Sequence, residues 1–85
     1  MLYYNVRLLY SEARQIGPHT ANYRLCEYSD PDGTDFIFFV KYNGTVNRCT
    51  LGCATRAEAL RRFSLLTRSR TTPLSLIDSV YEMHK

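Results

Sequence analysis

The dipeptide Asn43-Gly44 separates two runs of strand-forming residues, and it constrains the fold of this chain more than any other feature. Both runs belong to the stretch 34–51, TDFIFFVKYNGTVNRCTL, which is rich in aromatic and β-branched side chains. Asn and Gly tolerate the positive φ angles of a type I′ turn, which is well suited to joining antiparallel strands. The stretch therefore predicts a β-hairpin in which Tyr42 faces Thr45.

The alternation of side chains along a strand assigns each residue of this hairpin to one of two faces. One face is almost entirely apolar, and we expect it to be the core face. The other mixes Ile and Phe with Lys and Arg, so we expect it to be thinly covered or used for binding. The first face takes Phe36, Phe38, Val40, Tyr42, Cys49 and Leu51, and the second takes Ile37, Phe39, Lys41, Val46, Arg48 and Thr50.

Two further strands are predicted before the hairpin. Residues 2–10 alternate cleanly, which predicts a half-buried strand with Val6 and Leu8 on the core side and Arg7 on the other. Residues 11–20 contain a Gly-Pro pair and are predicted to form a connection, with room for a short helical turn.

The stretch 21–28 alternates again and is predicted to be the second strand. The sequence Ser-Asp-Pro-Asp-Gly that follows at 29–33 is typical of a hairpin loop. With a four-residue loop, Tyr23 and Leu25 fall on the core face, while Arg24 and Tyr28 fall on the opposite face.

A helix is predicted to begin after Thr55, because Thr55 and Glu58 have the spacing of a capping box. It should extend to about Thr67 and pack on the first face of the sheet. Its apolar stripe consists of Ala59, Leu60, Phe63 and Leu66, and its outward residues are Arg61, Arg62, Leu65 and Arg68.

The stretch 74–83 has two interpretations. Thr72-Pro73 would start a helix well, with Thr as the cap and Pro at the first helical position. The sequence IDSVYEM is also rich in strand formers and follows the helix after a short link, as the return strand of a ββαβ unit would. We favour the strand.

Together these elements predict one α+β domain over residues 1–85. A four-stranded antiparallel sheet is packed by one amphipathic helix, and the C-terminal element is a fifth strand or a second helix. The predicted core consists of Tyr4, Val6, Leu8, Leu25, Phe36, Phe38, Val40, Leu51, Leu60, Phe63 and Leu66.

The sequence shows no motif typical of an enzyme, a cofactor site or a metal site. It has no glycine-rich phosphate loop, and neither His19 nor His84 has a clear catalytic partner. The acidic cluster at 30–35 lacks the distant Glu of a calcium loop. We therefore predict a protein that is not an enzyme and binds no cofactor or metal.

The cysteines and the hydropathy pattern bear on the compartment. Cys26, Cys49 and Cys53 are odd in number and no export signal is recognisable, so we predict free thiols. No apolar run approaches the roughly 18 residues of a membrane-spanning helix. We expect a soluble protein that is made and stays in the cytoplasm.

Positive charge is concentrated on one part of the chain. Nine Arg and two Lys, against eight Asp and Glu, give a net charge of +3, and residues 48–70 hold six of those Arg against one Glu. Arginine favours planar contacts with carboxylates or phosphates. The predicted partner-binding residues are Arg7, Arg24, Tyr28, Phe39, Lys41, Arg48, Arg61, Arg62, Leu65 and Arg68.

Three interpretations of these residues stay open. They could dock an acidic protein surface, because Tyr and Arg dominate interface hot spots. They could bind RNA or single-stranded DNA, with aromatic rings stacking on bases and cations contacting phosphates. They could also form an ordinary solvent-facing side of a sheet.

The segments HTANYRLCEY, KYNGTVNR and TRAEALRRF, in this order and spacing, resemble small phage anti-CRISPR proteins that inhibit type I-F surveillance complexes. The resemblance covers about residues 19–66. It implies a small cytoplasmic sheet-plus-helix binder, a viral inhibitor or adaptor that blocks a surface of a protein or protein–nucleic acid complex. The helix is basic, whereas an inhibitor that mimics DNA should be acidic, so DNA mimicry is not expected.

Residues 34–83 also resemble the ββαβ unit of a eukaryotic large-subunit ribosomal protein, which would imply contact with RNA instead. Neither resemblance assigns a role to a particular residue.

Overall fold

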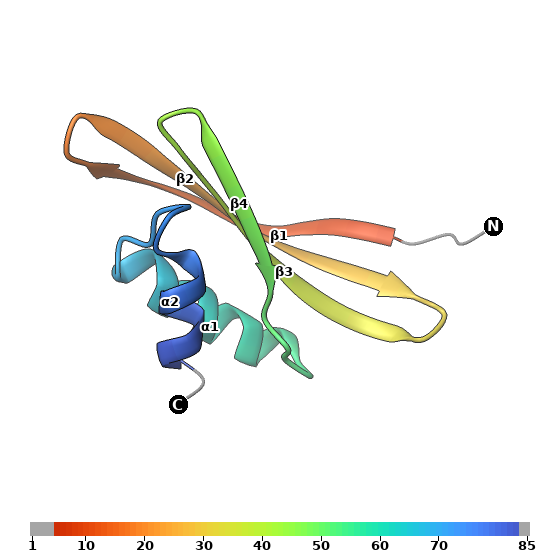
Figure 1. Ribbon diagram of the computed structural model, residues 1–85. Coiled ribbons are helices and arrows are strands. Elements are labelled where there is room, and N and C mark those ends of the chain that lie inside the picture. Colours follow the sequence, from red (N-terminus) through yellow and green to blue (C-terminus); the bar gives the residue numbers. More distant parts are fainter. Residues whose placement is uncertain (1–4, 84–85) are drawn as a thin grey trace.

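The computed structural model describes residues 5–83, which form a four-stranded antiparallel sheet with two helices on one side of it (Figure 1). The strands follow one another in the order β1-β2-β3-β4. This architecture confirms the predicted α+β class with an antiparallel sheet. The elements are β1 (Asn5–Ile16), β2 (His19–Asp30), β3 (Gly33–Tyr42), β4 (Thr45–Thr50), α1 (Arg56–Arg68) and α2 (Leu76–Met83).

The β3–β4 hairpin is the one that the Asn-Gly turn predicts. Asn43 has a φ of 50° and Gly44 a φ of 80°, and Tyr42 pairs with Thr45. On the predicted core face Phe38 is fully buried. Both the register and the assignment of the two faces are therefore confirmed for this hairpin.

The first strand differs from the prediction in its extent. β1 continues from Asn5 to Ile16, so the segment 11–16 is strand, not connection or helical turn. Ile16 pairs with His19, and the turn between them consists of two residues, one of which is Gly17 with a φ of 58°. Glycine accepts this conformation without strain, so a tight turn replaces the long loop.

The predicted assignment of β1 residues to the two faces of the sheet is partly wrong, because β1 contains a β-bulge at Leu9. Leu8 pairs with Cys26 while Tyr10 pairs with Leu25, so the pairing shifts by one residue between them. Such a shift reverses the side to which the following residues point. Val6 and Leu8, predicted as core, are 60% and 54% exposed on the side away from the helices. Tyr4 lies outside the described residues.

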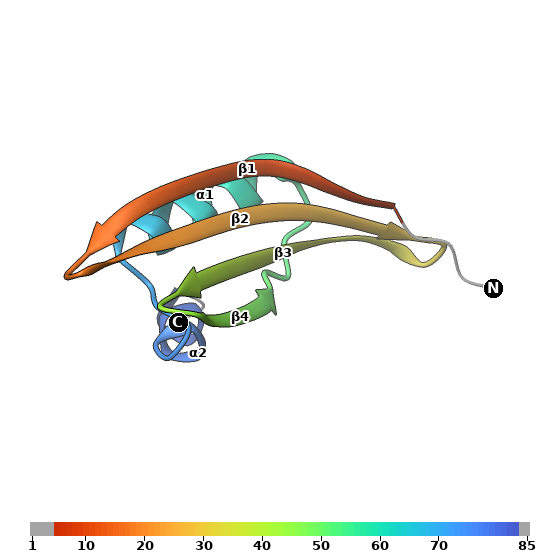
Figure 2. The same cartoon turned by 90° about the horizontal axis from the view of Figure 1, so that it is seen from above.

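The helix α1 begins and packs as predicted. The Thr55 side chain accepts a hydrogen bond from the Glu58 backbone N–H at 3.2 Å, which caps the helix. Figure 2, a view from above, shows α1 behind β1 and β2 and α2 beside β4. Phe63 of α1 packs on Phe38, with ring centroids 5.8 Å apart. Of the predicted helix stripe only Leu60 is partly exposed.

The preference for a C-terminal strand is wrong, because residues 76–83 form the helix α2. The side chains of Thr72 and Ser75 bond each other, and the Ser75 carbonyl accepts from the Ser79 N–H. Leu76 is buried and Val80, one turn later, packs on the core beside it. Burial of residues spaced by four outweighs the strand preference of single residues.

The core lies between the sheet and the helices. It includes every predicted residue of β2, β3 and α1 apart from the partly exposed Leu60, and it adds Ala21, Tyr23, Cys53, Ala59 and Leu76. Tyr23 donates a hydrogen bond of 2.7 Å from its hydroxyl to the carbonyl of Thr71 in the α1–α2 connection. This bond attaches the connection to the centre of the sheet.

Thr71 gives a first prediction about stability. Its Oγ1 is buried without a hydrogen-bond partner among the described residues. We expect Thr71→Val to raise the free energy of unfolding by about 1 kcal/mol in urea denaturation, because it removes a desolvated hydroxyl with little change of shape. The matched control is Thr67→Val: Thr67 is also buried, but its Oγ1 donates to the Ser64 carbonyl at 3.1 Å. Equal destabilisation by both changes would contradict the prediction.

Candidate binding surface

The side of the sheet away from α1 and α2 is covered by no described element, and we call it the open face. Side chains from all four strands form it, because paired residues of neighbouring strands point to the same side. The open face consists of Val6, Leu8, Ser11, Ala13, Asn22, Arg24, Cys26, Tyr28, Asp35, Ile37, Phe39, Lys41, Val46, Arg48 and Thr50.

A row of cations crosses the open face. Arg24 of β2 pairs with Phe39 of β3, which pairs with Arg48 of β4, so the aromatic ring lies between two exposed arginines. Lys41, also exposed, is the next residue of β3 on the same face. Among the side chains that the structure describes, within residues 5–81, these three cations form no salt bridge. They are therefore available to a partner molecule.

Aliphatic side chains lie on both sides of this row. Leu8, Cys26 and Ile37 pair across three strands and form the middle of the open face. Val6 is 60% exposed near one end and Val46 is 58% exposed near the other. An aliphatic and aromatic surface of this kind, left open beside cations, is typical of an interaction site.

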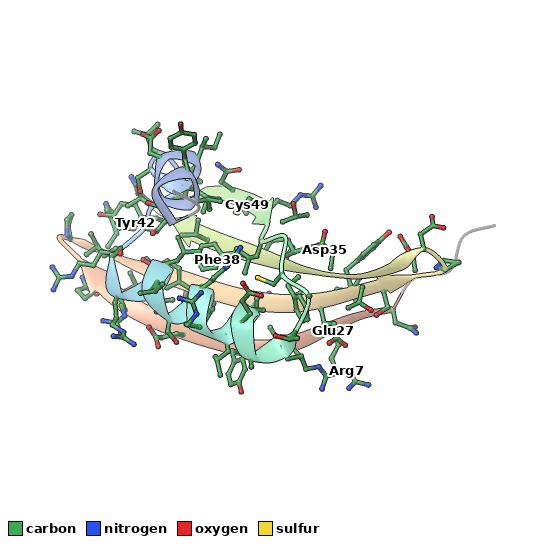
Figure 3. The ribbon with its side chains drawn as sticks, turned by 90° about the horizontal axis from the view of Figure 1, so that it is seen from below. Arg7, Glu27, Asp35, Phe38, Tyr42 and Cys49 are labelled. Carbon is green, nitrogen blue, oxygen red and sulfur yellow. The ribbon has the colours of Figure 1, made fainter. Side chains whose placement is uncertain are left out.

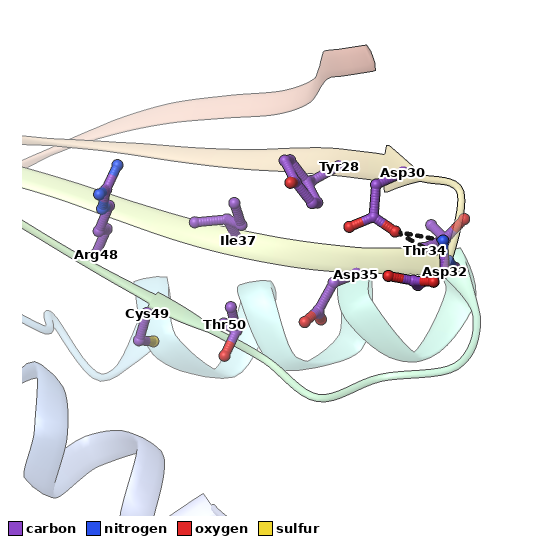
Figure 4. A pocket seen from close by; sticks show the side chains of 10 residues that line it. Tyr28, Asp30, Asp32, Thr34, Asp35, Ile37, Arg48, Cys49 and Thr50 are labelled. Carbon is purple, nitrogen blue, oxygen red and sulfur yellow. Dashed lines mark hydrogen bonds between the residues drawn. The ribbon is translucent and has the colours of Figure 1, made fainter. Parts of the chain in front are cut away.

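The end of the open face at the β2–β3 turn is acidic. Here a hollow of 770 Å³ extends from Arg48 across Ile37 to Asp30 and Asp35 (Figure 4). The Asp30 carboxylate accepts hydrogen bonds from the backbone N–H groups of Asp32 and Gly33 at 2.8 and 3.0 Å, which fixes the two-residue turn. The basic row and the acidic turn thus lie on opposite sides of the row Leu8, Cys26 and Ile37.

The outward residues of α1 form a second, separate surface on the opposite side of the molecule. Arg61, Leu65 and Arg68 are exposed there, as predicted. The prediction that Arg62 points outward is wrong, because its side chain turns inward. Its guanidinium donates to the Leu51 carbonyl at 2.6 Å and to the Glu58 carboxylate at 2.9 Å, so it joins the helix to the end of the sheet.

The prediction that Arg7 lies on the face used for binding is also wrong, because Arg7 lies on the helix side of the sheet (Figure 3). It pairs with Glu27, which accepts two hydrogen bonds from Arg56 of α1, at 2.6 and 2.9 Å. The bonds from Arg56 hold the pKa of Glu27 below its ordinary value, and Arg7 adds to this effect. Arg7 therefore belongs to the sheet–helix junction and not to the open face.

The cysteines, the possible metal ligands and the helices of the described residues give three further observations. All three cysteines are free thiols, and burial raises the pKa of each, which lowers the fraction of reactive thiolate. Among the described side chains of residues 5–81 no group of three or more His, Cys, Asp or Glu is placed to hold a metal ion. In the same range neither helix has the length and apolarity to cross a bilayer.

Part of the open face is predictable from the sequence, and part is not. Arg24, Tyr28, Phe39, Lys41 and Arg48 lie on it as predicted. Val6 and Leu8 were assigned to the core because the bulge was not recognised. Its signal is the unbroken apolar run Leu8-Leu9-Tyr10, which interrupts the alternation.

Comparison of the chain with family models, curated proteins and solved structures finds no match. The resemblances to anti-CRISPR inhibitors and to a ribosomal protein unit therefore remain predictions from the sequence.

Proposed function

We propose that the chain is a non-enzymatic binding module that docks another protein on the open face of its sheet. The observation that carries the proposal is the placement of both helices on one side, which leaves Val6, Leu8 and Val46 more than half exposed on the other. An antiparallel sheet commonly has one apolar face, which is buried, and one polar face, which contacts water. Here the second face is itself aliphatic at its centre, so a further layer would stabilise it.

The charges on the open face define the partner. It should present an apolar centre opposite Ile37 and Phe39, with carboxylates opposite the cationic row and a positive group opposite Asp35. By covering such a surface the chain would act as an inhibitor or an adaptor, which is also the role that the anti-CRISPR resemblance implies.

A protein fits this surface better than a nucleic acid does. Aliphatic groups such as Val6 and Leu8 offer no ring on which a base can stack. The carboxylates of Asp30 and Asp35 would repel a phosphate backbone that extends along the strands. The feature that favours RNA or single-stranded DNA is the row Arg24–Phe39–Arg48, an aromatic ring between two cations.

Site-specific photo-crosslinking tests the proposal. We expect a photo-activated phenylalanine analogue at position 39 of the open face to trap a discrete protein in extracts of the cells that make the chain. The same analogue at position 61, on the outer face of α1, is the matched control and should trap none. Mass spectrometry then identifies the trapped protein and the attached residue. Absence of a protein adduct at position 39, or equal adducts at both positions, would overturn the proposal.

Fluorescence anisotropy against random single strands decides the nucleic-acid alternative. The proposal predicts no saturable binding at low salt. If single-stranded nucleic acid does bind, we expect the logarithm of the association constant to fall linearly with the logarithm of the salt concentration. Three cations contacting phosphates predict a slope of about −2. If that salt dependence is lost in a variant without the three cations, the partner of the open face is a nucleic acid and not a protein.

A further inference from the structure

We infer that the partner of the open face is a second copy of this chain, in a symmetric face-to-face dimer. This inference rests on the proposed function and adds the identity of the partner. Its basis is that the open face is complementary to itself, because it carries opposite charges on the two sides of the row Leu8, Cys26 and Ile37. An interface across a two-fold axis requires a surface that is complementary to itself, and this arrangement of charges meets the requirement.

The register of the strands fixes where the axis lies. It runs across the strands along the row Leu8, Cys26 and Ile37, in the plane between the two sheets. Rotation about this axis places the basic row of one copy over the acidic end of the other. Arg48 on β4 then lies diagonally across from Asp35 of the second copy, and the symmetry makes this contact twice.

The remaining charges agree with the same arrangement. Lys41 of one copy lies over the end of β3 in the other copy, beside Asp30. Arg24 lies over the position of Tyr28 on β2, where a cation and an aromatic ring attract each other. Every cation of the open face thus meets an acidic or aromatic group of the second copy.

The area of the overlap is that of a small, weak dimer interface. β4 ends at Thr50, in the row of the axis, so β1, β2 and β3 are the strands that overlap. Three strands spaced by about 4.8 Å and about nine residues at about 3.4 Å each give roughly 440 Å² per copy. A pair would then bury about 900 Å², which is typical of a weak, concentration-dependent association. The two sheets would form a sandwich with the aliphatic row at its centre.

Pairing through the edge of β1 is the competing way to join two copies. The bulge at Leu9 interrupts this edge, and the ion pair between Glu12 and Arg14, at 2.6 Å, places charged groups along it. Bulges and charges on an edge strand hinder the addition of another strand. The open face is therefore the favoured surface.

Charge exchange tests the symmetric dimer. We expect sedimentation equilibrium of the wild-type chain to show a monomer–dimer equilibrium. Asp35→Arg and Arg48→Asp should each weaken the dimer by about tenfold or more, because each places like charges together at two symmetric contacts. An equimolar mixture of the two variants should form a heterodimer with an affinity near that of wild type, because both contacts are then attractive again. Arg61→Asp, with the same charge change on α1, is the control and should leave the dimer unchanged.

Three results would overturn the inference: a monomer at every concentration up to the solubility limit, a dimer unaffected by either charge reversal, or a mixture that does not reassociate. Circular dichroism confirms that each variant is folded. Photo-crosslinking at position 39 separates this failure from failure of the proposed function. If the trapped protein is a different chain, the proposed binding function holds but the partner is not a second copy. If the chain is a monomer and gives no adduct, both the proposed function and the dimer are wrong.

Discussion

Phe38→Ala is expected to lower the free energy of unfolding by about 3–5 kcal/mol. Phe38 is fully buried, and its ring contacts Tyr23 and Phe63 with centroids 5.7 and 5.8 Å apart. Truncation removes apolar area from the interior and leaves a cavity between the sheet and α1. Because small proteins are stable by only about 5–15 kcal/mol, the variant should lose much of its stability. Urea denaturation measures the change.

Phe39→Ala is the matched control, since Phe39 is the same residue type one position along β3 and points to the opposite face. It is partly exposed, and we expect its loss to cost about 1 kcal/mol or less. Both unfolding curves should be measured at low protein concentration, because a dimer would add stability to the wild type. Similar costs for the two changes would show that the two faces of the hairpin are not distinct.

Local signals explain why the β3–β4 hairpin and α1 are predictable from the sequence. The turn at Asn43-Gly44 fixes the register, and a fixed register determines on which face Phe38 and Phe39 lie. The cap at Thr55 and the stripe that follows fix the start and the buried side of α1 in the same way. The predicted binding residues of this hairpin, Phe39, Lys41 and Arg48, therefore lie together on the open face.

Features that depend on contacts between distant parts of the chain cannot be predicted from local sequence signals. The bulge at Leu9 is defined only by the pairing of β1 with β2, and one extra residue is enough to reverse the side of Val6 and Leu8. Arg62 lies on the polar side of a helical wheel, yet the Leu51 carbonyl lies within 2.6 Å of it in the folded chain. The helix α2 forms because Leu76 and Val80 find a core to pack against.

Tyr23→Phe is expected to lower the free energy of unfolding by about 1–3 kcal/mol. The change keeps the ring that packs on Phe38 and removes only the hydroxyl, so the Thr71 carbonyl loses its bond of 2.7 Å. Tyr23 is fully buried, and water cannot easily replace the lost donor. Tyr42→Phe is the matched control: its hydroxyl donates to the Ile16 carbonyl at 2.7 Å but is only partly buried, so its cost should be smaller.

The pH dependence of stability gives an independent measure of the Tyr23 hydroxyl. Burial raises its pKa above the ordinary value of 10.0, so the folded chain keeps this proton at a pH where the unfolded chain releases it. The unfolded state then binds fewer protons than the folded state, and stability falls as the pH rises above about 10. Wild type should therefore lose stability more steeply than Tyr23→Phe when urea midpoints are compared between pH 9 and pH 11. Parallel losses would show that the Tyr23 hydroxyl ionises as freely in the folded chain as in the unfolded one.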